Sequence, residues 1–214
     1  WEISCRDEGI SVVANGPLKG KTLQYLMETF KDELLGSKVY RSSPTWFPLL
    51  IKIIDANDKL SVQVHPDDTY AKANNEENGK TEMWYVIDAK PGANLIYGLA
   101  NGTGKQEFLD AIAQKNITGV LNYVPVKPGD SFYIPAGTVH AILDGILIAE
   151  IQQNSNTTYR VYDWDRIGPD GKGRQLHLDR AIDCIDFGFK PGGSVPPEAK
   201  SCGSYTIKTL SHNR

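Results

Sequence analysis

The segment Gly129-Asp-Ser-Phe-Tyr-Ile-Pro135-Ala-Gly137-Thr-Val-His140 constrains the fold of this chain more than any other part of its sequence. Its glycines permit a tight turn and a close approach of neighbouring strands. Its proline fixes a backbone bend and so directs the histidine that follows. The segment therefore predicts closely packed strands with one histidine aimed into the space between them.

The rest of the chain has the pattern of a β protein with few helices. Strands are predicted at 49–54, 60–65 and 82–87, with strands and hairpins throughout 120–163. A tight hairpin is predicted at Asp144-Gly145. Many short strands separated by turns favour a β-sandwich or a jelly roll.

Two helices are predicted. Apolar residues recur at three- and four-residue steps over 22–35, and Gly36 follows as a stop signal. A second helix is predicted at 105–115, because Thr103 and Gln106 have the spacing of a capping box.

Composition narrows the class of protein. The 214 residues suffice for one large domain, or for one domain and the start of another. A net charge of −3 without a cluster of Lys and Arg argues against nucleic-acid binding, and no apolar run is long enough to span a membrane. Three cysteines without a C-x-x-C pattern suit free thiols in a reducing cytoplasm, which is the predicted location.

Four residues form a candidate metal site. Gln63 and His65 are two residues apart on a predicted strand and so share one face. Glu82 opens the next strand, and His140 lies on a later one. Two imidazoles and two oxygen ligands suit zinc or another divalent metal.

These segments carry a resemblance to a known family. The segment ending at His140 fits the second motif of the cupins, G-x5-P-x-G-x2-H. Leu60-Ser-Val-Gln-Val-His65-Pro-Asp-Asp68 and Gly79-Lys-Thr-Glu82-Met-Trp84 resemble the signature of type I mannose-6-phosphate isomerases, in which Gln-x-His replaces the usual His-x-His. The run from Gln153 to Arg166 resembles the active-site arginine segment of that family in its short bacterial form.

The resemblance implies a mainly β, cupin-type double-stranded β-helix (jelly roll) with a few peripheral α-helices. It implies one Zn²⁺ per chain and interconversion of mannose 6-phosphate and fructose 6-phosphate through a cis-enediol. The implied partner is a small phosphosugar, and the chain is expected to be a monomer or a homodimer. Residues 1–195 would form the catalytic domain, with part of its N-terminus missing before Trp1. Residues 196–214 would be a linker and the first strand, 205–210, of a truncated C-terminal β-domain.

The reaction needs a base, a metal and cations for the developing charge and the phosphate. Candidate catalytic residues are Arg160, Lys80 and Glu150. Candidate substrate-binding residues are Lys52, Ser61, Lys172 and Arg174.

Alternatives remain open from sequence. Lys80, Lys172 and Arg174 could be ordinary loop cations, and Arg160 could pair with Asp163 or Asp165. At the level of function, a metal-containing sugar-binding cupin without turnover, acting as a sensor or regulator, is a second hypothesis. An iron-dependent cupin dioxygenase is a third, since two histidines and one glutamate also suit iron.

Overall fold

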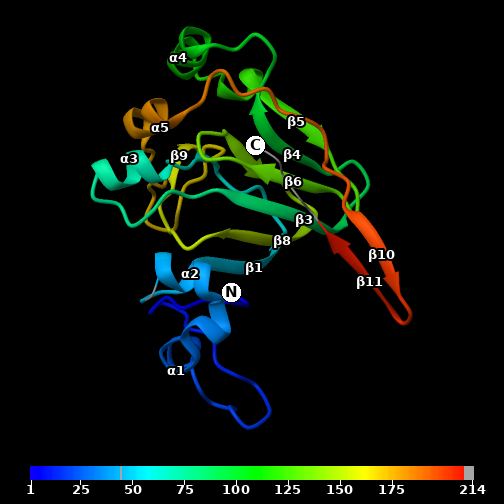
Figure 1. Cartoon of the computed structure of the whole chain (residues 1–214). Coiled ribbons are helices and arrows are strands. Elements are labelled where there is room, and N and C mark those ends of the chain that lie inside the picture. Colours follow the sequence, from blue (N-terminus) through cyan, green and yellow to red (C-terminus); the bar gives the residue numbers. More distant parts are fainter. Residues whose placement is uncertain (44, 210–214) are drawn as a thin grey trace.

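The computed structural model describes residues 1–43 and 45–209, and most of its strands form two facing antiparallel sheets (Figure 1). One sheet has the strand order β1-β8-β3-β6 and the other has the order β5-β4-β7-β2-β9. This arrangement confirms the mainly β jelly roll. The strands are β1 (Leu49–Ala56), β2 (Val62–Val64), β3 (Glu82–Ala89), β4 (Asn94–Leu99), β5 (Leu121–Pro125), β6 (Ser131–Ile134), β7 (His140–Ile142), β8 (Ile146–Gln153), β9 (Tyr159–Tyr162), β10 (Glu198–Cys202) and β11 (Tyr205–Thr209).

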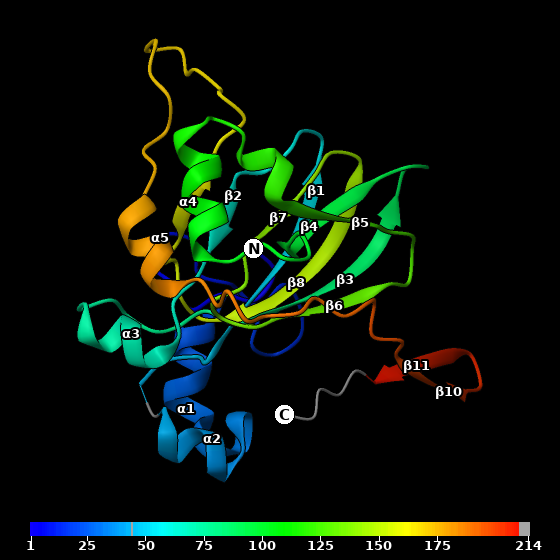
Figure 2. The same cartoon turned by 90° about the horizontal axis from the view of Figure 1, so that it is seen from above.

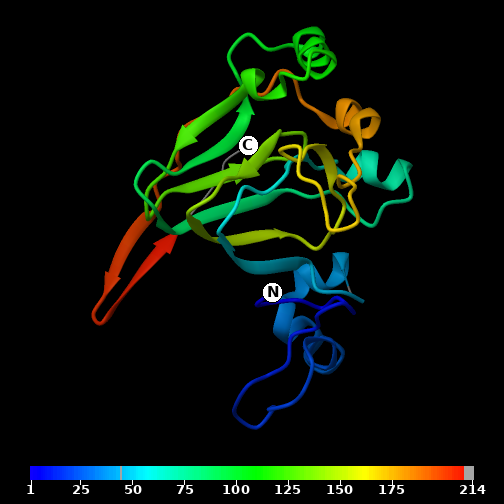
Figure 3. The same ribbon diagram turned by 180° about the vertical axis from the view of Figure 1, so that it is seen from behind.

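The helices are peripheral. α1 and α2 lie beside β1, and α4 lies at the opposite end of the molecule (Figures 1 and 3). Within the described part of the chain, no helix is long and apolar enough to cross a membrane. The helices are α1 (Leu23–Leu35), α2 (Ser37–Ser42), α3 (Asp68–Ala73), α4 (Lys105–Ala113), α5 (Leu178–Cys184) and the short 3₁₀ helix η1 (Ile117–Val120).

Two apolar clusters bury the five-stranded sheet on both faces. Val62 and Val64 of β2 belong to a cluster that also contains Phe108 of α4 and Ala181 of α5. Figure 2 shows α4 and α5 on the side of the molecule where β2 lies. The second cluster fills the space between the sheets, where residues of β3, β6 and β8 meet residues of β4 and β7. Apolar burial of this kind is the main driving force for the fold.

The inward face of the four-stranded sheet changes character along its strands. On β8 the inward residues run from Ile146 and Ile148 to Glu150 and Gln152, all buried. On β3 they run in the opposite direction, from Glu82 through Trp84 to Val86. Because these strands are antiparallel, their polar residues meet at the same end of the barrel. One end of the interior is thus apolar and the other carries buried charges.

Both predicted helices are present, with one correction. α1 begins after Thr22, whose side chain accepts a hydrogen bond from the Tyr25 N–H, and Gly36 follows its last residue. The capping box at Thr103 and Gln106 is wrong by one residue. Glu107 instead accepts a 3.0 Å hydrogen bond from the Gly104 N–H. The Thr103 N–H already donates to Ala100 in the preceding turn, so it is not free to receive a capping side chain. α4 starts at Lys105, as predicted, and ends at Ala113 instead of 115.

The predicted hairpin at Asp144-Gly145 is also wrong. β7 pairs with β2 and β4, whereas β8 pairs with β1 and β3, so the turn carries the chain from one sheet to the other. Gly145 has a φ of 79°, which favours glycine, and its N–H donates to Ala56. The turn was recognisable from sequence, but the sheets that it connects were not.

The predicted strand at 205–210 is present as β11. β11 pairs with β10 along its length, and position 210 lies outside the described residues. The predicted linker before this hairpin contacts the edge of β6, where the Val195 N–H donates to Ser131. The division into domains at 195/196 stays a prediction.

Candidate metal centre and arginine pocket

Three potential metal ligands meet at the polar end of the barrel. His65, Glu82 and His140 come from three different strand regions, and each offers a ligand atom within 4.8 Å of the others. Nε2 of His65 lies 3.2 Å from Oε1 of Glu82, and Nε2 of His140 lies 3.7 Å from Oε2. All three side chains are buried, at 1% exposure.

Strand register brings Gln63 to the same cluster. In the five-stranded sheet β2 lies between β7 and β9, and Gln63 is the register partner of His140 on one side and of Arg160 on the other. Its amide nitrogen lies 3.4 Å from Nε2 of His140. All four predicted ligands therefore lie together, with Gln63 closest to the arginine side.

Burial determines the charges of this cluster. Burial and the nearby Lys80 lower the pKa of His65 to about 3, and burial lowers the pKa of His140. Burial alone would raise the pKa of Glu82, but Lys80 and the histidines hold it well below its usual range. Two neutral imidazoles beside an ionised carboxylate are the protonation states that metal ligation requires.

The donor set fits a divalent cation. Nδ1 of His65 and Oε1 of Glu82 are buried and form no hydrogen bond within the described residues. Nδ1 of His140 lies 2.8 Å from the carbonyl of Thr138. A backbone acceptor at Nδ1 fixes the ring and leaves Nε2 free as a ligand. Oε1 of Glu82 pairs with Nζ of Lys80 at 2.9 Å, so this buried oxygen already attracts a cation, and a divalent ion at the centre of the cluster would be stabilised by the same carboxylate.

Buried polar side chains continue behind the cluster. Nζ of Lys80 lies 2.9 Å from Oε1 of Glu82 and 3.1 Å from Nε2 of His65. Lys52 pairs with Glu150 at 2.7 Å, so it is not an edge lysine pointing to water. Burial and the charge of Glu82 raise the pKa of Glu150, although Lys80 and Lys52 oppose that shift.

A cationic pocket of about 580 Å³ opens beside Gln63. Arg160, Arg166 and Arg174 line it together with Ser61. Its other lining residues are Asp58, Lys59, Leu60, Asn156 and Thr158. Because Gln63 lines the pocket and also contacts His140, the pocket adjoins the metal cluster.

One carboxylate holds two of the three arginines. Asp163 pairs with Arg166 at 2.5 Å, and Nε of Arg174 donates to it at 2.8 Å. Arg160 instead donates to the carbonyl of Gln175 at 2.8 Å, and its buried Nε has no partner within the described residues. Burial and the nearby Arg174 lower the pKa of Arg160. Asp58 also lines the pocket and pairs with Arg166 at 3.3 Å. The three arginines and Lys59 still outnumber Asp58 and Asp163, so the pocket is net positive and suited to an anion.

An unusual turn returns the chain to this pocket after β9. Trp164 and Asp165 have φ values of 57° and 54°, a left-handed conformation that is uncommon outside glycine. Trp164 donates to the carbonyl of Leu60 at 2.8 Å, and Tyr162 donates to Asp165 at 2.9 Å. These two hydrogen bonds hold the turn that places Arg166 at the pocket.

All but one of the predicted site residues lie at the polar end of the barrel or in the pocket beside it. The residues brought to the polar end of the barrel or to its adjoining pocket are Lys52, Ser61, Gln63, His65, Lys80, Glu82, His140, Glu150, Arg160 and Arg174. Lys172 does not line the pocket, and its backbone N–H donates to Asp170 within the exposed loop.

Three further residues were missed from sequence. Arg166 and Lys59 line the pocket, and the indole of Trp84 contacts Glu82. Arg166 closes the arginine-containing segment already noted, which was a usable signal. Trp84 follows Glu82 by two residues, so strand alternation alone places both on one face.

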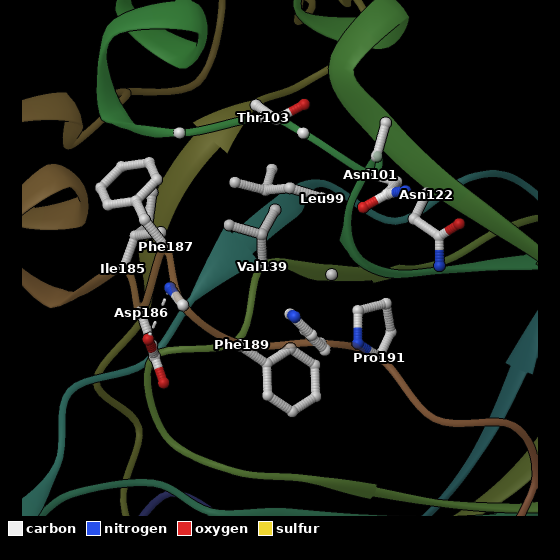
Figure 4. A pocket seen from close by; sticks show the side chains of 16 residues that line it. Leu99, Asn101, Thr103, Asn122, Val139, Ile185, Asp186, Phe187, Phe189 and Pro191 are labelled. Carbon is white, nitrogen blue, oxygen red and sulfur yellow. Dashed lines mark hydrogen bonds between the residues drawn. The ribbon is translucent and has the colours of Figure 1, made fainter.

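A separate cavity of about 560 Å³ lies at the β4–α4 loop (Figure 4). Leu99, Val139, Phe187 and Phe189 contribute much of its lining, together with backbone of the glycine-rich stretch 98–104. No residue of this cavity belongs to the metal cluster or to the arginine pocket.

Known proteins are similar to this chain in sequence and in fold. Residues 1–92 match the family model "Phosphomannose isomerase type I, catalytic domain". The mannose-6-phosphate isomerase of Streptococcus mutans is 49% identical over 196 residues, which cover 92% of this chain and 60% of that protein. The probable mannose-6-phosphate isomerase GmuF of Bacillus subtilis is 49% identical over 213 residues, covering 97% of this chain and 64% of GmuF.

The crystal structure of the mannose 6-phosphate isomerase from Bacillus subtilis superposes with a TM-score of 0.87 at 41% identity, covering 100% of this chain and 66% of the other. The chain belongs to the type I phosphomannose isomerase family. Its fold is accordingly the cupin fold. A zinc-bound mannose 6-phosphate isomerase also shares the fold, with a TM-score of 0.58 at 17% identity over 86% of this chain and 65% of that one. The chain spans 60–66% of the length of the first three relatives.

Proposed function

We propose that this chain carries the catalytic site of a zinc-dependent isomerase that interconverts mannose 6-phosphate and fructose 6-phosphate through a cis-enediol. The observation that supports this most is the contact between a buried two-histidine, one-glutamate cluster and a pocket lined by three arginines. A group of metal-ligating side chains alone would suit many cupins. A cationic pocket joined to it through Gln63 suits a substrate that carries both hydroxyls and a phosphate.

Gln63, His65, Glu82 and His140 would hold the metal. Their atoms are already gathered, and the histidines are held neutral by burial. A bound zinc ion supplies a Lewis acid that stabilises negative charge on the sugar oxygens during the reaction. The relative from Streptococcus mutans is a mannose-6-phosphate isomerase, and one mannose 6-phosphate isomerase of the same fold is zinc-bound, which supports the assignment to this chain.

The arginine pocket would bind the phosphate. Arg166 and Arg174 are held by Asp163, so they present donors in fixed directions, and Arg160 lines the same pocket. Arginine is well suited to phosphate because its planar group donates two parallel hydrogen bonds. Ser61 lines the same pocket and would add a hydroxyl donor.

Lys80 is the proposed proton-transfer group. The reaction moves a proton from C2 to C1, and the group that carries it must lie within hydrogen-bond reach of both carbons. Nζ of Lys80 is buried beside Glu82 and His65, two of the residues that would hold the metal. Glu150 is the second candidate, but its carboxylate is already engaged by Lys52 and Trp84.

The test is an assay for fructose 6-phosphate formed from mannose 6-phosphate by the zinc-loaded chain, with and without a chelator, alongside His140→Ala. We expect turnover that is lost with the chelator, restored by zinc and absent in the variant. His177→Ala is the matched control for zinc content, because His177 binds the backbone of Arg160 and not the cluster. A folded, zinc-loaded chain without turnover would refute the enzyme and favour the binding-only cupin.

Location and assembly are also proposals. The three cysteines Cys5, Cys184 and Cys202 are free in the structure, which suits a reducing cytoplasm. We propose a cytoplasmic enzyme that acts on a small phosphosugar, as a monomer or a homodimer.

A further inference from the structure

The indole of Trp84 bridges two carboxylates inside the barrel. Its single N–H lies 3.0 Å from Oε2 of Glu82 and 3.1 Å from Oε1 of Glu150. Both acceptors are buried, and the tryptophan itself is 1% exposed. An indole N–H only donates, so it can bring two carboxylates together where any acceptor would repel them.

Strand pairing builds this contact. Lys52 of β1, Glu150 of β8 and Trp84 of β3 are direct register partners across three neighbouring strands. Glu82 lies two residues before Trp84 on the same face. Lys52 pairs with the other oxygen of Glu150, Oε2, at 2.7 Å. A continuous line of polar contacts therefore runs from Lys52 through Glu150 and Trp84 to Glu82.

The same indole also packs against a second ligand. The ring of Trp84 meets the ring of His140 edge to face, with centroids 5.3 Å apart and an interplanar angle of 76°. Trp84 thus touches two members of the cluster, one through a hydrogen bond and one through its ring.

We propose that Trp84 is a positioning residue for the metal centre, and that Glu150 and Lys52 act through it. The N–H of Trp84 holds Oε2 of Glu82, which leaves Oε1 turned toward His65 and Lys80. Glu150, anchored by Lys52, keeps the indole in its plane. This inference rests on the proposed metal site, and it gives Glu150 a supporting role behind the cluster in place of a role as base.

Hydrogen bonds to the side chains that ligate a metal affect how tightly the metal binds. Removing a hydrogen bond to a ligand commonly weakens metal affinity about 10–100-fold. A tryptophan that only fills the core would lower the stability of the fold when truncated and leave the metal affinity of the folded protein unchanged.

The experiment compares Trp84→Phe with Trp164→Phe. Both variants lose an indole N–H donor, but that of Trp84 is shared by Glu82 and Glu150, whereas that of Trp164 goes to the carbonyl of Leu60, outside the cluster. Zinc affinity of each folded, metal-free chain is measured by competition with a chromophoric chelator. We expect Trp84→Phe to bind zinc about 10–100-fold more weakly than the wild type and Trp164→Phe to match it.

The outcomes separate this inference from the proposed metal site. If the wild-type chain binds no zinc, the metal site fails and this inference fails with it. If the wild type binds zinc and Trp84→Phe binds it equally well, the metal site stands and the positioning role is overturned.

A measurement on the wild-type chain decides the case if Trp84→Phe does not fold. The chain has four tryptophans, so its indole N–H groups give four NMR signals that substitution of Trp1, Trp46 and Trp164 assigns. Addition of zinc should move the Trp84 signal and leave that of Trp164 in place. An unmoved Trp84 signal in a zinc-bound chain contradicts the proposal.

Discussion

Replacing Lys52 by methionine measures how strongly the polar end of the barrel is held together. The Lys52 side chain is 16% exposed and that of Glu150 is 5% exposed, and their charged atoms are 2.7 Å apart. At an effective dielectric of about 20, two unit charges at this distance attract each other by about 6 kcal/mol. Part of this is offset by desolvation, and losing one partner of a buried pair typically costs about 3–5 kcal/mol.

Protonation limits that cost. Without Lys52 the pKa of Glu150, already raised by burial and by Glu82, rises further. Neutralising a carboxyl costs about 1.4 kcal/mol for each pH unit above its unfolded pKa of about 4.3. We therefore expect Lys52→Met to lose about 3 kcal/mol of unfolding free energy at pH 7 and about 1 kcal/mol or less at pH 5.

The direction in which stability changes with pH follows from proton linkage. A folded pKa above the unfolded value means that the folded variant binds more protons, so its stability falls as the pH rises above about 4.3. Urea unfolding of the metal-free chain, followed by circular dichroism at both pH values, measures the effect. The double variant Lys52→Met with Glu150→Gln should recover stability at pH 7, because no charge stays buried. A loss below about 1 kcal/mol at pH 7, or the same loss at both values, would refute the reasoning.

Three further predictions concern other parts of the chain. Burial and nearby acids raise the pKa of Cys184 to about 12. We therefore expect Cys184 to resist alkylation by iodoacetamide at pH 8 in the folded chain and to react once the chain is unfolded, which peptide mass spectrometry would measure. Hydrogen bonds from Arg174 lower the pKa of Asp163 in the folded chain. Asp163 therefore stabilises the fold above its unfolded pKa of about 3.9, and this contribution is lost as the pH falls through its folded pKa. Acid unfolding should therefore be shallower in Asp163→Asn. Gly79→Ala should lower the free energy of unfolding in urea by about 1–3 kcal/mol, because a Cβ there would lie 2.5 Å from a backbone nitrogen at the start of α3. Gly192→Ala is the control and should leave the free energy of unfolding unchanged, because a Cβ there would meet no atom within 4 Å.

Local sequence patterns predicted much of the site. Strand alternation placed Gln63 and His65 on one face, and in the structure both side chains lie against His140. The helix over 22–35 was also predictable, since its apolar spacing, its Thr22 cap and its Gly36 stop are all local. Strand positions added Glu82 and His140 to the candidate site, the family resemblance supported them, and both lie beside His65.

The partners of these residues were not predictable in the same way. Nothing near Lys52 in the sequence indicates that Glu150, 98 residues later, would neutralise it. The sequence left open a pair between Arg160 and Asp163 or Asp165, but Asp163 binds Arg166 and Arg174 instead. The turn at Gly145 was recognised, whereas its role in joining two sheets was not.

The sequence by itself determined which side chains face inward, because the two-residue period of a strand is a property of the local backbone. Only the tertiary structure decided which inward side chains meet, because strand order and register depend on contacts between distant segments. The line from Lys52 through Glu150 and Trp84 to Glu82 exists because β1, β8 and β3 are neighbours. A slip of one residue in either pairing would turn these side chains to opposite faces and separate them.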